Sequence, residues 1–183
     1  MDEVIRRIIQ WNVRRVFILG GIIMGIKRFK LCFEIDRELV FHEVQKIIYG
    51  KTEYGDDIFK LKIIEISIVK SINKNIVDYI SKNYFDTMEE AIIDLQKQLP
   101  NNIKITSCQS CKYGNYCIFG NNANEIFCLI DFPPPKDKLD LADIFNGHWE
   151  SLPVYELNHF CEKYQRATKD NDYFTYNSWD LYL

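Results

Sequence analysis

The sequence predicts an α+β domain: an antiparallel sheet, two or three helices, and a cysteine-rich strand–loop–strand held by zinc. Residues 26–35 and 58–68 alternate apolar and polar side chains with the period of a strand. A helical pattern follows at 87–99. Cys108 and Cys111 then form a Cys-x-x-Cys pair, the spacing at which two thiolates can hold one metal ion.

Residues 1–23 are interpreted separately from the rest. The run Gly20-Gly21-Ile22-Ile23-Met24 is what a purine-rich ribosome-binding site followed by a start codon would encode, so we expect translation to begin at Met24. One alternative is an N-terminal helix, with a stripe formed by Val4, Ile8, Trp11 and Arg15. Another is an anchor in the apolar run 16–26, which is about half the ~20 residues that span a bilayer.

Residues 24–183 are expected to form a single domain. A hydrophobic content of 47% is enough to build a core. We place a meander and helices in residues 24–100, and the cysteine-rich part in residues 101–183.

Three segments of the first half predict an antiparallel meander. Residues 26–35 place Phe29, Leu31, Phe33 and Ile35 on one face. Asp36-Arg37 is a plausible turn, and residues 38–49 form either a second strand or a strand that enters a short helix. In 58–68 the apolar positions shift by one residue after Ile63, which indicates a β-bulge.

Two helices are expected to follow, between the two halves of the sheet. Residues 75–84 place Ile76, Ile80 and Tyr84 on one stripe. Thr87 and Glu90 fit a capping box at the start of the second helix, which Pro100 ends. Residues 139–145 predict a third, short helix with Asp137 as its cap. The aromatic residues of the tail 170–183 are expected to pack against the domain.

The cysteines predict a structural zinc site. Such a site takes four soft ligands in a tetrahedron, commonly four thiolates. Cys108 and Cys111 supply the first two, and Cys128, within an apolar strand-like run, supplies the third. The fourth is Cys117 or Cys161, and the weaker candidates are His148 and His159.

Three other interpretations of the cysteines compete with zinc. A buried free cysteine behaves as a small hydrophobic residue, and we expect this of Cys32. A Cys-x-x-Cys pair can be a redox pair, although turn residues follow this one instead of a helix. Disulfides would require export, and the chain lacks a convincing secretion signal, so we expect a cytoplasmic protein.

The cysteine motif resembles that of a family of small bacterial proteins of uncharacterised function. Their shared pattern is Cys-x-x-Cys-[KR]-[YF]-x-x-Tyr, then a glycine, a cysteine in a strand and a later cysteine. The resemblance spans residues 95–179 and favours Cys161 as the fourth ligand. Members of this family occur near polymorphic toxin and immunity genes, which implies toxin neutralisation. The matching residues are Cys108, Cys111, Lys112, Tyr113, Tyr116, Gly120, Cys128 and Cys161.

Composition and motifs narrow the classes of function. A net charge of −3 argues against a general nucleic-acid binder, which needs a basic surface. No nucleophile elbow, phosphate-binding loop or His-Glu-x-x-His motif is present, and we expect no catalytic residues.

The sequence therefore favours a non-enzymatic interaction protein with a protein partner, an immunity protein being its specific form. The alternative is a zinc-ribbon-like nucleic-acid-binding module, in which charge and stacking would come from Lys104, Lys112, Tyr113 and Tyr116. No membrane partner is expected, and the oligomeric state stays open.

Overall fold

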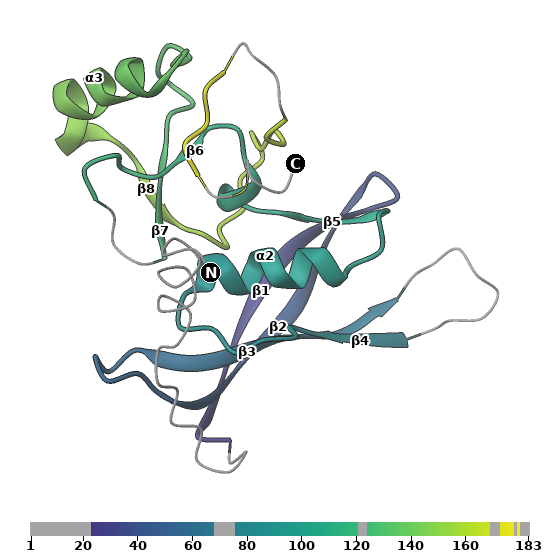
Figure 1. Cartoon of the computed structure of the whole chain (residues 1–183). Coiled ribbons are helices and arrows are strands. Elements are labelled where there is room, and N and C mark those ends of the chain that lie inside the picture. Colours follow the sequence, from purple (N-terminus) through teal and green to yellow (C-terminus); the bar gives the residue numbers. More distant parts are fainter. Residues whose placement is uncertain (1–22, 68–75, 121–123, 169–172, 178, 180–183) are drawn as a thin grey trace, which may run out of the picture.

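The computed structural model describes residues 23–67, 76–120, 124–168, 173–177 and 179. These residues form an α+β structure, as predicted. A five-stranded antiparallel sheet curls into a half-barrel, and a three-stranded sheet lies beyond it (Figure 1). The expectations for residues 1–22 lie outside the described ranges. Among the described helices, none is both long and apolar enough to cross a bilayer.

The predicted meander is confirmed. Its strands are β1 (Gly25–Ile35), β2 (Glu38–Lys51) and β3 (Asp57–Ser67), and each pairs with the next in antiparallel register. Residues 38–49 are strand throughout, so the helical alternative for that segment is wrong. Asp36 and Arg37 have φ angles of 51° and 75°, which are the left-handed values that a tight two-residue hairpin requires.

The helix predicted at residues 75–84 is wrong, because β4 (Ile76–Ile80) is a strand on the edge of β3. The spacing of Ile76 and Ile80 suits both a helix and a strand, so tertiary pairing decided between them. The predicted bulge is confirmed at this edge. Ile63 to Ile66 on β3 spans three residue steps, whereas the partners Tyr79 to Val77 span two.

Helix α2 (Met88–Gln98) begins and ends as predicted. Thr87 caps it by accepting a hydrogen bond from the Glu90 backbone at 3.4 Å, and the helix stops at Leu99 before Pro100. Its apolar stripe lies across the concave face of the large sheet (Figure 1). The buried residues of this stripe are Ala91, Ile92, Ile93 and Leu95.

The two strands predicted around the cysteine pair belong to different sheets. β5 (Ile103–Thr106) pairs with β1, and the Gln96 side chain of α2 bonds its Ile105 N–H at 2.6 Å and its Ile103 carbonyl at 3.1 Å. β7 (Glu125–Cys128) lies between β6 (Gly114–Asn115) and β8 (Val154–Glu156) in the small sheet. The cysteine segment therefore connects the two sheets.

Helix α3 (Lys138–His148) covers the small sheet. The predicted cap is confirmed, since the Asp137 carboxylate accepts from the backbone N–H groups of Leu139 at 2.8 Å and Asp140 at 3.0 Å. Of the two helices predicted between the sheet halves only α2 is present, because residues 76–80 form β4, whereas the third helix follows the cysteine segment as predicted. Where the tail is described it packs inward as expected, and Trp179 is 3% exposed.

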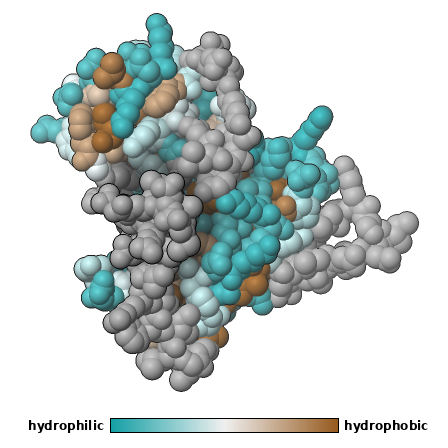
Figure 2. Space-filling model, in the orientation of Figure 1, coloured by the Kyte–Doolittle hydropathy of each residue, from teal (hydrophilic) through white to brown (hydrophobic). Residues whose placement is uncertain are grey.

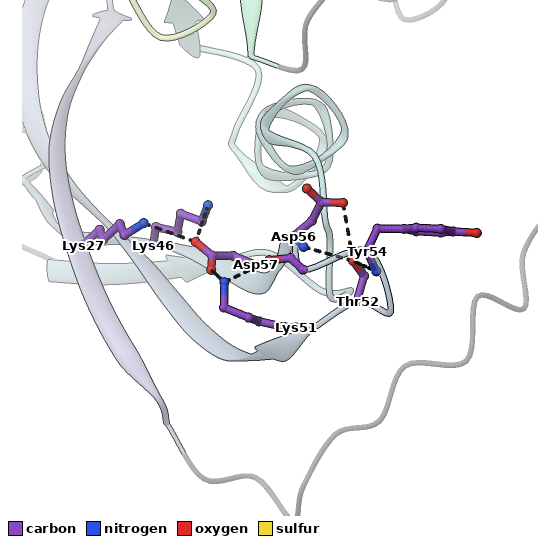
Figure 3. Close-up of polar contacts among 8 residues, drawn as sticks. Lys27, Lys46, Lys51, Thr52, Tyr54, Asp56 and Asp57 are labelled. Carbon is purple, nitrogen blue, oxygen red and sulfur yellow. Dashed lines mark hydrogen bonds and ion pairs between the residues drawn. The ribbon is translucent and has the colours of Figure 1, made fainter.

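A cluster of charged side chains links β1, β2 and β3 (Figure 3). The Asp57 carboxylate lies 3.1 Å from Lys51 and 3.3 Å from both Lys27 and Lys46. Burial by itself would raise the pKa of Asp57, but hydrogen bonds from the three lysines outweigh it and lower the pKa from 3.8 to about 2. The folded state therefore stabilises the ionised form of the Asp57 carboxylate.

Replacing Asp57 by Asn should destabilise the fold by about 1–2 kcal/mol at neutral pH, a value reduced because two of the lysines are exposed. The folded pKa is depressed, so the stabilisation is complete above pH 3.8 and is lost as the pH falls to about 2. Urea unfolding of both proteins between pH 7 and pH 2 measures this difference. The exposed neighbour Glu53 provides the control Glu53→Gln, and equal stability of Asp57→Asn and wild type at pH 7 would contradict the prediction.

Candidate metal centre

The Cys-x-x-Cys pair lies on one tight turn at the end of β5. Residues Cys108–Ser110 form a 3-10 turn, closed by a 3.3 Å bond from the Cys111 N–H to the Cys108 carbonyl. Ser110 stabilises the turn from inside, because its Oγ accepts from the Ser107 N–H at 3.1 Å and lies 3.0 Å from the Ile105 carbonyl. Both thiols are thereby presented from the same short segment.

Gly114 lets the next segment of the chain pass against this turn. A Cβ atom at this position would lie 2.1 Å from the Cys108 carbonyl oxygen and 2.9 Å from the Ile126 side chain. Glycine alone fits this contact. Gly114 also pairs with Cys128 across β6 and β7, and this pairing brings the third cysteine beside the first two.

Backbone hydrogen bonds attach residues 157–167 to the cysteine turn. The four bonds join Cys108 N to His159 O (2.7 Å), Gln109 N to Leu157 O (3.2 Å), Lys112 N to Gln165 O (2.8 Å), and Ala167 N to Ser110 O (2.9 Å). Cys161 lies within this attached segment. Its position is therefore determined by main-chain bonds on both sides of it.

Tyr164 adds a side-chain contact to the same attachment. Its hydroxyl donates to the Ser110 carbonyl at 3.3 Å and lies 3.1 Å from the Ser110 Oγ. Burial raises the pKa of Tyr164 to about 12, so the phenol keeps its proton and can act as this donor.

Cys108, Cys111, Cys128 and Cys161 line one cavity of about 350 Å³. Cys108 and Cys111 are 6% and 5% exposed, and the other two are half-buried. The alternative fourth ligand Cys117 lines a different hollow, where its Sγ accepts from the Phe119 N–H at 3.4 Å. The arrangement brings together the four residues that the motif favoured and leaves Cys117 apart.

The thiols of the cavity influence one another electrostatically. Burial raises the pKa of Cys108, and the neighbouring Cys111, Cys128 and Cys161 raise it further. Burial also raises the pKa of Cys111, and hydrogen bonds with the backbone of Gln165 and Tyr113 partly offset that rise.

Cys128 behaves in the same way. Burial raises its pKa, and the Ile130 backbone N–H partly offsets that rise. The raised pKa values favour the protonated form of Cys108, Cys111 and Cys128 unless a cation joins them.

The donor set suits a soft divalent ion, since four thiolates are a common ligand set of structural zinc. Within the described residues, no group of three or more His, Cys, Asp or Glu side chains is already arranged as a formed metal site. Zn–S bonds of about 2.3 Å in a tetrahedron require S···S separations of about 3.8 Å. A bound ion would therefore require the four Sγ atoms to adopt these separations within their cavity.

The weaker histidine candidates are placed differently from each other. His159 lines the cysteine cavity, but its ring stacks on Tyr155 with centroids 4.6 Å apart. His148 ends α3 and contacts Phe132. Cys32 lies in β1, fully buried with a free thiol, as expected of a small hydrophobic residue.

Three of the four residues proposed for nucleic-acid binding make contacts within the chain. Tyr113 meets the Tyr173 ring edge-on at 5.5 Å, and the Lys112 ammonium lies 5.0 Å from the Tyr113 ring centroid. Tyr116 packs against the larger core, whereas Lys104 is exposed on β5. The two tyrosines therefore serve packing around the cysteine turn.

Sequence reasoning missed four residues that build this centre. Gly114 directly follows the motif's Lys-Tyr pair, and a glycine so close to two ligands was a readable signal of close backbone approach. Ser107 and Ser110 each directly precede one cysteine of the pair, at capping-box spacing, which was also readable. The attachment of Tyr164 to Ser110 had no sequence signal, because the two residues are remote along the chain.

No protein-family model matches this chain, and no curated protein or solved structure shows significant similarity to it. The resemblance carried by the cysteine motif thus stays a prediction from the motif itself.

Replacing Gly114 by Ala should destabilise the protein by about 3 kcal/mol, because the added methyl group meets a backbone carbonyl that cannot move away. Urea unfolding measures the loss. Gly147→Ala in α3 is the matched control, since a Cβ there meets nothing within 4 Å and alanine favours a helix by up to about 1 kcal/mol. An unchanged unfolding midpoint for Gly114→Ala would show that the close approach does not exist in solution.

Proposed function

We propose that Cys108, Cys111, Cys128 and Cys161 bind one structural Zn²⁺, and that the chain is a non-enzymatic interaction protein. The observation that carries the zinc proposal is the convergence of four thiols from three separate segments on one cavity. Four soft donors leave no position for a water or substrate, which is typical of structural zinc. The ion would supply attachment between the turn, β7 and residues 157–167.

Zinc accounts for the cluster better than the alternatives do. All six cysteines are free thiols. Unrelated thiols have no reason to line the same cavity, whereas the ligands of one zinc ion must do so. The half-buried position of Cys128 and Cys161 leaves a route by which the ion can enter.

Zinc analysis of the purified full chain should give one ion per chain, and Cys161→Ser should lower this value strongly because the tetrahedron loses a ligand. Cys117→Ser is the matched control and should keep its zinc. Cobalt substitution should give the absorption of a tetrahedral thiolate complex. Removing the metal should cost about 4 kcal/mol of stability when free zinc exceeds its dissociation constant a thousandfold. Zinc-free protein with oxidised cysteine pairs would contradict the proposal.

The interaction role is proposed in the form of an immunity protein that neutralises a toxin. It is supported by the resemblance of the Cys108–Cys161 motif to a family found beside toxin and immunity genes. The net charge of −3 is compatible with a basic partner. The absence of recognisable catalytic motifs in the sequence agrees with a binding role.

The product of the adjacent gene should therefore form a complex with this protein, measurable by calorimetry with purified components. In parallel, titration of DNA and RNA oligonucleotides at low salt tests the zinc-ribbon alternative, which requires salt-sensitive binding. We expect the protein complex and a flat nucleic-acid titration, because the motif tyrosines already pack within the chain. Salt-sensitive oligonucleotide binding with no protein complex would favour the alternative.

A further inference from the structure

A second hollow, the α3 groove, lies apart from the cysteine cavity. It has a volume of about 930 Å³ and runs beside α3 and the 3-10 turn Trp149–Ser151. Its apolar base consists of side chains that are at most 5% exposed, namely Cys117, Phe127, Phe145 and Leu152. In Figure 2 the end of the molecule that carries α3 shows hydrophobic residues among hydrophilic ones.

The rim of the groove exposes large apolar side chains. Phe119 is 63% exposed, Trp149 is 51% exposed and Val154 is 45% exposed. Isolated apolar residues on a surface need no explanation, but several around one hollow indicate a contact surface. Tryptophan is also among the residue types enriched at the energetic hot spots of protein–protein interfaces.

Trp149 is held in a fixed aromatic cluster. Its ring lies 5.2 Å from the Phe127 ring and 6.1 Å from the Phe145 ring, and these two rings meet edge-on at 5.1 Å. One side of the indole is thus supported while half of the residue remains exposed. A partner would meet a pre-organised surface and would lose little side-chain entropy in binding it.

The charges at the groove are acidic. Glu125 and Glu150 belong to its lining, and among the described residues that line it none is Lys or Arg. Glu150 directly follows Trp149 and is exposed. A carboxylate beside an exposed aromatic ring attracts a cation through both charge and the ring quadrupole.

An edge strand borders the same groove. β8 (Val154–Glu156) pairs with β7 on one side and is the last strand of the small sheet, and its Val154 lines the groove. An exposed sheet edge can receive an extended peptide through main-chain hydrogen bonds. The groove therefore offers an edge for the backbone, an apolar base for aliphatic side chains and an acidic aromatic rim for a cation.

We propose that the α3 groove binds an extended segment of a partner protein that presents an Arg or Lys flanked by apolar residues. The proposal rests on the interaction role proposed above, and it does not depend on the zinc site. Charge selects the occupant, since an acidic peptide would be repelled by the rim. The cation occupies the side of Trp149 and Glu150, and the flanking aliphatic side chains lie on the base.

The test is a fluorescence anisotropy titration of the full chain with labelled nine-residue peptides. Each peptide has one central residue flanked by Val and Leu on both sides, and this residue is Arg, Lys, citrulline or Glu. The Arg and Lys peptides should bind about fivefold or more tightly than the citrulline peptide, which is neutral but similar in shape. The Glu peptide should bind most weakly.

Variants locate the binding on the surface. Trp149→Ala and Glu150→Lys should each weaken binding of the Arg peptide about fivefold or more. Tyr54→Ala and Glu53→Lys are matched controls on the exposed β2–β3 turn, which is not part of the groove lining, and should leave binding unchanged. Unfolding curves and zinc content are measured for every variant, so a folding defect is recognised separately.

Three results would overturn the proposal. They are equal affinity for the Arg and citrulline peptides, unchanged binding in Trp149→Ala and Glu150→Lys, and no binding of any peptide at about 1 mM. Self-association that Trp149→Ala abolishes, without peptide binding, would assign the groove to a second copy of this chain instead. If the product of the adjacent gene binds Trp149→Ala and Glu150→Lys as tightly as it binds wild type, only the groove proposal is refuted. Peptide binding without such a complex would refute only the toxin partner.

Discussion

The second half of this chain depends on the main-chain bonds between the cysteine turn and residues 157–167. Regular structure is sparse there, so few backbone groups find partners within a long helix or sheet. The bonds from Cys108, Gln109 and Lys112 to the later segment satisfy buried backbone groups that would otherwise be costly. They also place Cys161 beside the turn, and the close contact at Gly114 places Cys128 there.

The larger hydrophobic core contains side chains from both halves of the chain and so joins them. The side chains of α2 and the curled sheet share one cluster with Ile126, Leu157 and Trp179 from the later part of the chain. Loosening the attachment of residues 157–167 would therefore also expose apolar surface beneath α2. The smaller core between α3 and β7 is built mainly from aromatic and leucine side chains, and it supports the half-exposed Trp149.

Charge is distributed unevenly over the molecule. Three lysines of β1 and β2 surround Asp57 of β3, whereas carboxylates belong to the lining of the α3 groove. The thiol cavity is a third environment, in which burial, with repulsion between the thiolates, raises the pKa of Cys108, Cys111 and Cys128. The ion and the protein partner proposed above would therefore occupy separate places on the molecule.

Local patterns were sufficient where one segment carried its own physical signal. The alternation around Phe33, the cap at Thr87 and the phase shift after Ile63 correctly gave a strand, a helix start and a bulge, since each depends on residues close in sequence. The cysteine spacing likewise named candidate ligands before any geometry was known. Residues 76–80 were mistaken for helix because their spacing fits both periods, and only the unpaired edge of β3 made them a strand. The motif favoured Cys161 over Cys117, but no local pattern could place Cys161 beside the cysteine turn. That placement follows from backbone bonds between remote segments, whose formation depends on how the whole chain closes around Gly114.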